Sequence, residues 1–102
     1  MTALPFLAIL GITQMKLYTN RELYDWLVLL ASRLEVLGSE ALSKDVAMAA
    51  RTVNTFPATE LLGESRIVLR HVLAEENGLL SQTDRAEVQN VLRQVDAAFD
   101  QR

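Results

Sequence analysis

The chain has 102 residues, of which 50% are hydrophobic and 6% aromatic, and its formal net charge is −3. The absence of cysteine excludes disulfides, thiolate catalysis and zinc–thiolate sites, and no basic patch typical of nucleic-acid-binding proteins is visible. With 4 glycines and 2 prolines, the chain has too few turn residues for an all-β domain. We therefore expect one helical domain, in the cytoplasm, without a nucleic-acid partner.

The first fifteen residues carry no charge. A secretory signal needs a basic stretch before its apolar run and a small-residue cleavage site, and the apolar run over residues 4–12 has neither. The run is also shorter than the roughly 20 apolar residues of a membrane-spanning helix. Either residues 1–14 form a short strap packed on the fold, or translation begins at Met15 and they are a disordered extension. We favour the strap, followed by a single helical domain over residues 15–102.

The first helix is predicted over residues 20–37. Thr19 and Glu22 have the spacing of a capping box, in which side chains at the start of a helix satisfy its unpaired backbone N–H groups. Gly38 then ends the helix, as a glycine after the last turn commonly does. Leucines at spacings of four and three predict the buried stripe: Leu23, Leu27, Leu30, Leu34 and Leu37.

The apolar arc of this helix is wider than one buried stripe requires. Trp26 and Leu29 extend the arc on one flank. Some element must therefore cover them: another helix of the bundle, the N-terminal strap, a second copy of the chain or a different protein. We favour the interpretation that both side chains are buried within the monomer. The alternative is that they bind a partner.

Three further amphipathic helices are predicted, over residues 40–53, 58–76 and 82–100. Pro57 separates the first two of these, because the residue before a proline disfavours the helical conformation. The connections are short, so neighbouring helices should run antiparallel. The predicted fold is all-α, an antiparallel four-helix bundle. Its remaining core-facing residues are predicted to be Leu42, Val46, Ala49, Ala50, Val53, Leu61, Leu62, Val68, Leu69, Val72, Leu73, Val88, Val91, Leu92, Val95, Ala98 and Phe99.

The single histidine, His71, lies on the third of the four predicted helices. Glu60 and Glu64 share its face, and Glu75 follows one turn later. Glu64 and His71 are two turns apart, about 10 Å along the helix axis, which is too far for one metal ion. We interpret these carboxylates as a solvated acidic edge and predict no metal, no cofactor and no catalytic residue. An enzyme that uses His71 with a neighbouring glutamate is the least favoured alternative.

Arg66 and Arg70 are one turn apart on the opposite edge of the same helix. Like charges at this spacing repel each other, so we expect an acidic partner, either on another helix or on a bound protein. Gly63 lies next to them and costs about 1 kcal/mol in a helix relative to alanine. It therefore indicates a close contact, with the first helix or with a docking molecule.

The sequence predicts a non-enzymatic protein–protein interaction domain. The grounds are the absence of a catalytic motif, the broad apolar arc of the first helix and the edge formed by Arg66 and Arg70. By analogy of type only, a small acidic helical chain without cysteine resembles bacterial immunity proteins, antitoxins and adaptors, so an inhibitor or adaptor is the form of this hypothesis that we name. A homodimeric accessory subunit is the alternative. The predicted partner is another protein or a second copy, with no membrane involved. The predicted partner-binding residues are Trp26, Leu29, Arg66 and Arg70.

Overall fold

The computed structural model describes residues 16–55, 57 and 59–101. Within them the chain forms four α-helices, one 3-10 helix and no strand. The predicted strap, residues 1–14, lies outside the described residues. The helices are α2 (Asn20–Val36), α3 (Glu40–Ala50), the 3-10 helix η1 (Arg51–Asn54), α4 (Thr59–Glu75) and α5 (Gln82–Gln101).

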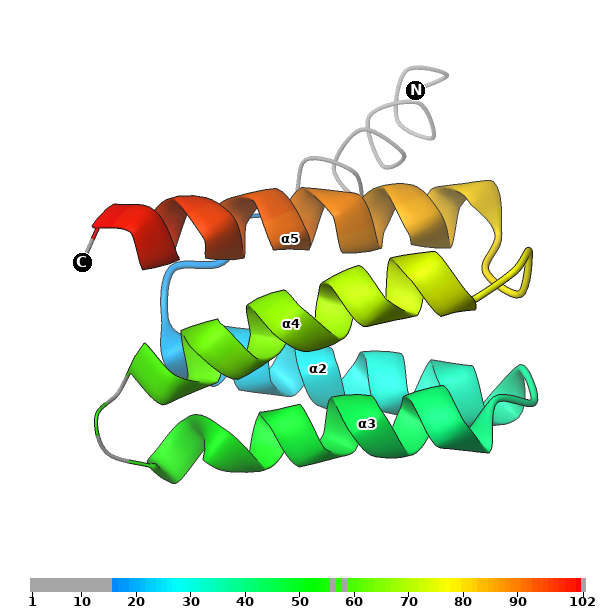
Figure 1. The fold of residues 1–102 in the computed structure, drawn as a ribbon, viewed down its shortest axis with the longest axis horizontal. Helices are drawn as coiled ribbons and strands as arrows, with labels where there is room; N and C mark the ends of the chain where they lie inside the picture. The colour runs from blue at the N-terminus through cyan, green and yellow to red at the C-terminus, as the bar shows by residue number, and fades with distance from the viewer. Residues whose placement is uncertain (1–15, 56, 58, 102) are drawn as a thin grey trace, which may run out of the picture.

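Successive α-helices run antiparallel to one another (Figure 1). α2 packs mainly on α3 and α4 packs mainly on α5, while contacts between α3 and α4 join the two pairs. Polar links tie α2 to α5: Arg33 pairs with Asp84, and just before α2 the Leu17 N–H donates to the Gln94 side chain at 2.8 Å. The predicted antiparallel four-helix bundle is confirmed.

The helix ends follow local sequence signals. At the start of α2, the Thr19 hydroxyl accepts a hydrogen bond from the Glu22 N–H at 3.1 Å, and the Glu22 carboxylate accepts from the Tyr18 N–H at 2.6 Å. Gly38 has a φ of +103°, the left-handed conformation that glycine adopts after a helix. Such signals explain why most predicted helix bounds agree with the structure to within one residue.

The end of α3 differs from the prediction of one helix over residues 40–53. The α-helix stops at Ala50 and tightens into η1, where the Thr52 hydroxyl donates to the Ala49 carbonyl at 2.7 Å. Thr55 is then extended, with a φ of −81° and a ψ of 145°, on the way to Pro57. A last turn of 3-10 type is a common way to close a helix before an extended segment.

The core lies between the four α-helices. Leu37 was predicted on the buried stripe but is 38% exposed, because α2 ends at Val36 and Leu37 belongs to the turn. Ala98 was predicted beside the stripe of α5 and is also exposed. The buried hydrophobic residues are Leu23, Trp26, Leu27, Leu30, Ala31, Leu34, Leu42, Val46, Ala49, Ala50, Leu61, Val68, Leu69, Val72, Leu80, Val88, Val91 and Val95.

A buried carboxylate organises the turn between α4 and α5. Glu76 is 3% exposed; one of its oxygens accepts from the Leu80 N–H at 2.9 Å, and the other pairs with Arg85. Asn77 and Gly78 turn the chain with positive φ angles of 50° and 82°. These contacts fix the start of α5 against the end of α4.

Candidate functional site

Trp26 and Leu29 have different environments in the folded protein. Trp26 is 7% exposed and belongs to the core, whereas Leu29 is 68% exposed. Leu29 lines a small cavity between α2 and α5, together with Arg33 and Glu87. Val36 follows Leu29 by seven residues on the same outward face and is 85% exposed. Trp26 is therefore part of the core cluster, whereas Leu29 is exposed.

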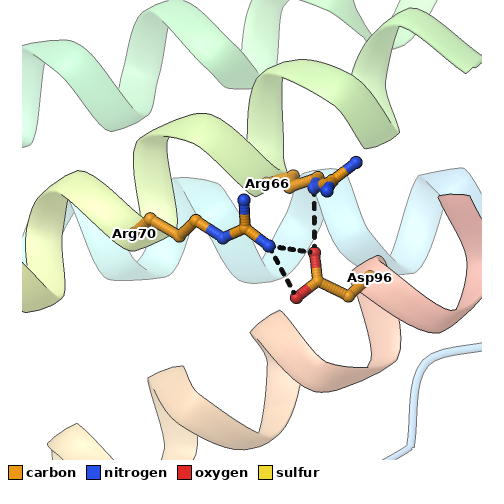
Figure 2. Close-up of polar contacts among 3 residues, drawn as sticks. All are labelled: Arg66, Arg70 and Asp96. Carbon is orange, nitrogen blue, oxygen red and sulfur yellow. Dashed lines mark hydrogen bonds and ion pairs between the residues drawn. The ribbon is translucent and has the colours of Figure 1, made fainter.

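Arg66 and Arg70 converge on one carboxylate of α5 (Figure 2). The Arg66 Nε lies 3.1 Å from one Asp96 oxygen, and an Arg70 guanidinium nitrogen lies 3.2 Å from both oxygens. The Arg66 guanidinium also lies 4.7 Å from the centroid of the Phe99 ring. The acidic partner that the sequence required is thus present within the bundle. An acidic group on another protein would have to compete with Asp96.

The contact indicated by Gly63 is made with α5. A Cβ atom at Gly63 would lie 3.4 Å from a ring carbon of Phe99, and no α2 atom is that close. Of the alternatives that the sequence allowed, contact with the first helix is therefore wrong. The Phe99 ring thus lies directly against α4 at Gly63, at a distance where a Cβ atom would just make van der Waals contact.

The two predicted residue pairs do not form one surface. Leu29 lies beside Glu87, and Arg66 lies beside Asp96. Glu87 and Asp96 are nine residues apart on α5, or about two and a half helical turns, which places them on opposite sides of that helix. A partner that contacts Leu29 would therefore not contact the two arginines at the same time.

A groove opens on the other edge of α4, between α4 and α3. Its cavity volume is about 490 Å³. Ala49 and Val68 form a buried floor, while Met48 and Ile67 on the two walls are 56% and 64% exposed. We call this the α3–α4 groove, and its lining residues are Asp45, Met48, Ala49, Thr52, Glu60, Glu64, Ile67, Val68 and His71.

The charges along the α3–α4 groove are mostly acidic. At one end, the His71 Nε2 lies 3.5 Å from an Asp45 carboxylate oxygen, and both side chains are about half exposed. At the other end, Glu60 and Glu64 are half-buried, and neither makes an ion pair within the described residues. No lysine or arginine lines the groove. A bound molecule would therefore meet an apolar floor with carboxylates at its edges.

Besides its apolar residues, the groove is lined by one hydroxyl, one imidazole and three carboxylates. The hydroxyl, which belongs to Thr52, donates to the Ala49 carbonyl at 2.7 Å. Glu75, predicted one turn after His71, is exposed and does not line the groove. Among the described residues, no group of three or more histidines and carboxylates is placed to hold a metal ion.

Sequence reasoning found part of this groove and missed the rest. It placed Glu60, Glu64 and His71 on one face but interpreted that face as a solvated edge. It did not select Met48 or Ile67, although both are large apolar residues outside the predicted stripes of their helices. Apolar residues left off a stripe were the signal that could have identified the walls.

The chain matches no family model, no curated protein and no solved structure. None of the helices in the described part of the chain has the length and apolar character needed to cross a membrane.

Proposed function

We propose that this protein is a non-enzymatic protein-binding domain that holds a partner protein in the α3–α4 groove. The observation that carries the proposal is the exposure of Met48 and Ile67 on both walls above a buried apolar floor. Single exposed apolar side chains are ordinary, but two that flank one groove offer a partner a concave apolar surface. We place the protein in the cytoplasm and propose that it acts as an inhibitor of the bacterial immunity or antitoxin type, or as an adaptor.

A binding role is favoured over an enzymatic one by the openness of the site. His71 and Asp45 are about half exposed and 3.5 Å apart, so water competes for both groups. General acid–base catalysis works best where a proton donor or acceptor is held against a substrate.

The test compares two double variants of the full chain. In Met48→Gln/Ile67→Gln both groove walls become polar; Leu29→Gln/Val36→Gln makes the same kind of change at exposed positions on α2. All four side chains are at least half exposed, so both variants should fold. Each is used for pull-down from the native host and then for calorimetry with the purified partner. We expect loss of binding for the groove variant alone, and equal binding by both variants would refute the proposal.

A homodimer formed through α2 is the second candidate function. The supporting observation is the outward pair Leu29 and Val36, which are 68% and 85% exposed on one face. Two copies that pack these faces together would bury both residues in a twofold symmetric contact. Analytical ultracentrifugation decides this alternative: a dimer that Leu29→Gln/Val36→Gln converts to a monomer supports it, and a monomeric wild type rules it out.

A further inference from the structure

We propose that the occupant of the α3–α4 groove is a cationic amphipathic helix of the partner protein. This inference rests on the proposed function and specifies the chemistry of the partner. It follows from the shape of the groove, from its exposed apolar side chains and from its unpaired carboxylates, which are considered in turn.

The shape of the groove suits a helix. Its α4 wall runs from Glu60 to His71, a span of about 16 Å or three helical turns. Its opposite wall runs from Thr52 of η1 back to Asp45 of α3, and α3 is antiparallel to α4. A third helix laid between two neighbouring helices packs its side chains into the groove between them, and the small Ala49 in the floor permits a close approach.

The apolar centre of the groove specifies where the bound helix must be apolar. Met48 and Ile67 face the groove midway between its charged ends. A helix that places leucine-like residues on one stripe would bury both side chains and cover Val68. Methionine adapts its shape to different partners, which suits a wall that receives another protein's side chains.

The carboxylates specify the charge of the bound helix. Glu60 and Glu64 are one turn apart, half-buried and unpaired within the described residues, so they repel each other. Lysine or arginine on the flanks of a bound helix would pair with both and remove that repulsion. An acidic helix, a nucleic-acid backbone or an anionic membrane surface would be repelled.

The charges on the other edge of α4, in contrast, do have a partner within the protein. There the one carboxylate of Asp96 on α5 pairs with both Arg66 and Arg70 (Figure 2). The Phe99 ring lies against Gly63 on the same edge. The acidic edge of α4 has no such internal counterpart among the described residues. The inferred helix would supply the acidic edge with opposite charge, as α5 supplies the basic edge with Asp96.

The test uses a fluorescent peptide of about 18 residues, long enough to form a helix in the groove. It carries leucines at spacings of three and four and lysines on both flanks. One control peptide has glutamate at each lysine position, and another has the same composition in an order that destroys the stripe. Fluorescence anisotropy should show binding of the cationic amphipathic peptide at least about tenfold tighter than of either control.

Charge variants of the protein complete the design. Glu60→Gln/Glu64→Gln should weaken binding of the cationic peptide about fivefold, and the difference should shrink as salt is raised. The matched control, Glu35→Gln/Glu87→Gln, also removes two negative charges, but from α2 and α5. It should change binding of the cationic peptide by less than about twofold. Equal weakening in both variants would mean that only the net charge acts, and would overturn the inference.

Two other outcomes would also overturn it. In the first, the Met48→Gln/Ile67→Gln variant no longer binds the native partner, while Glu60→Gln/Glu64→Gln binds that partner with full affinity. The groove would then bind a protein but not a cationic helix, and only the proposed function would survive. If ultracentrifugation without peptide shows a dimer that the Met48→Gln/Ile67→Gln variant abolishes, a second copy occupies the groove.

Discussion

Ser65 shows how a single residue can limit the stability of the bundle. Its side chain is fully buried on α4, and its hydroxyl has no hydrogen-bond partner within the described residues. A buried hydroxyl without a partner costs about 1–3 kcal/mol, and serine is also a weaker helix former than alanine. Ser65 therefore lowers the stability of the folded bundle relative to alanine at the same position.

We expect Ser65→Ala to raise the free energy of unfolding by about 1 kcal/mol, measured by urea denaturation. Ser43→Ala is the matched control, because the Ser43 hydroxyl donates to the Ala31 carbonyl at 2.7 Å and links α3 to α2. That variant should lose about 1 kcal/mol. A loss of stability for both variants would mean that the Ser65 hydroxyl is satisfied in solution.

Trp26 and Leu29 should respond oppositely to truncation, although both lie on one flank of α2. Trp26→Ala should lower the free energy of unfolding by about 3–5 kcal/mol because it opens a cavity in the core. Leu29→Ala should change it by less than about 0.5 kcal/mol because the side chain is exposed. Chemical denaturation of the two variants measures both values, and a large loss for Leu29→Ala would show that this side chain is covered.

At the scale of elements, the turn between α4 and α5 depends on the buried Glu76 carboxylate. Arg85→Ala removes the partner of one oxygen and leaves that oxygen buried, so we expect a loss of about 2 kcal/mol. Glu76→Gln retains an oxygen for the Leu80 N–H and should lose less. Thermal unfolding compares the two; a larger loss for Glu76→Gln would contradict this account of the turn.

The sequence predicted the elements well because their signals are local. Thr19, Gly38 and Pro57 act on backbone within a few residues, and the leucine stripes repeat within one helix. Which charged residues pair between two helices depends on how those helices pack. For that reason the sequence required an acidic partner for Arg66 and Arg70 but could not select Asp96.

The groove was only partly predictable for the same reason. The face shared by Glu60, Glu64 and His71 follows from helical spacing on one helix. That this face opposes Met48 and Asp45 follows from the packing of α4 on α3, which no single helix encodes. The sequence also showed the wide apolar arc of α2, and in the structure Trp26 of that arc belongs to the core cluster.

At the scale of the whole molecule, α4 divides its charges between two edges. On its basic edge Arg66 and Arg70 pair with Asp96 of α5, and its acidic edge lines the α3–α4 groove. The chain as a whole carries a net charge of −3, so the groove adds a local acidic field to a mildly acidic protein. A positively charged partner helix should associate faster at low salt than at high salt, with α4 as the element that attracts it.

The most direct test of the central claim is to map where a ligand binds. Isotope-labelled protein is titrated with the cationic amphipathic peptide, and changes in amide and methyl chemical shifts are assigned to residues. The account predicts that the largest changes fall on Met48, Glu64, Ile67 and Val68, with little change at Leu29, Val36 or Asp96. Changes concentrated on the outer face of α2, or on α5 around Asp96, would contradict it.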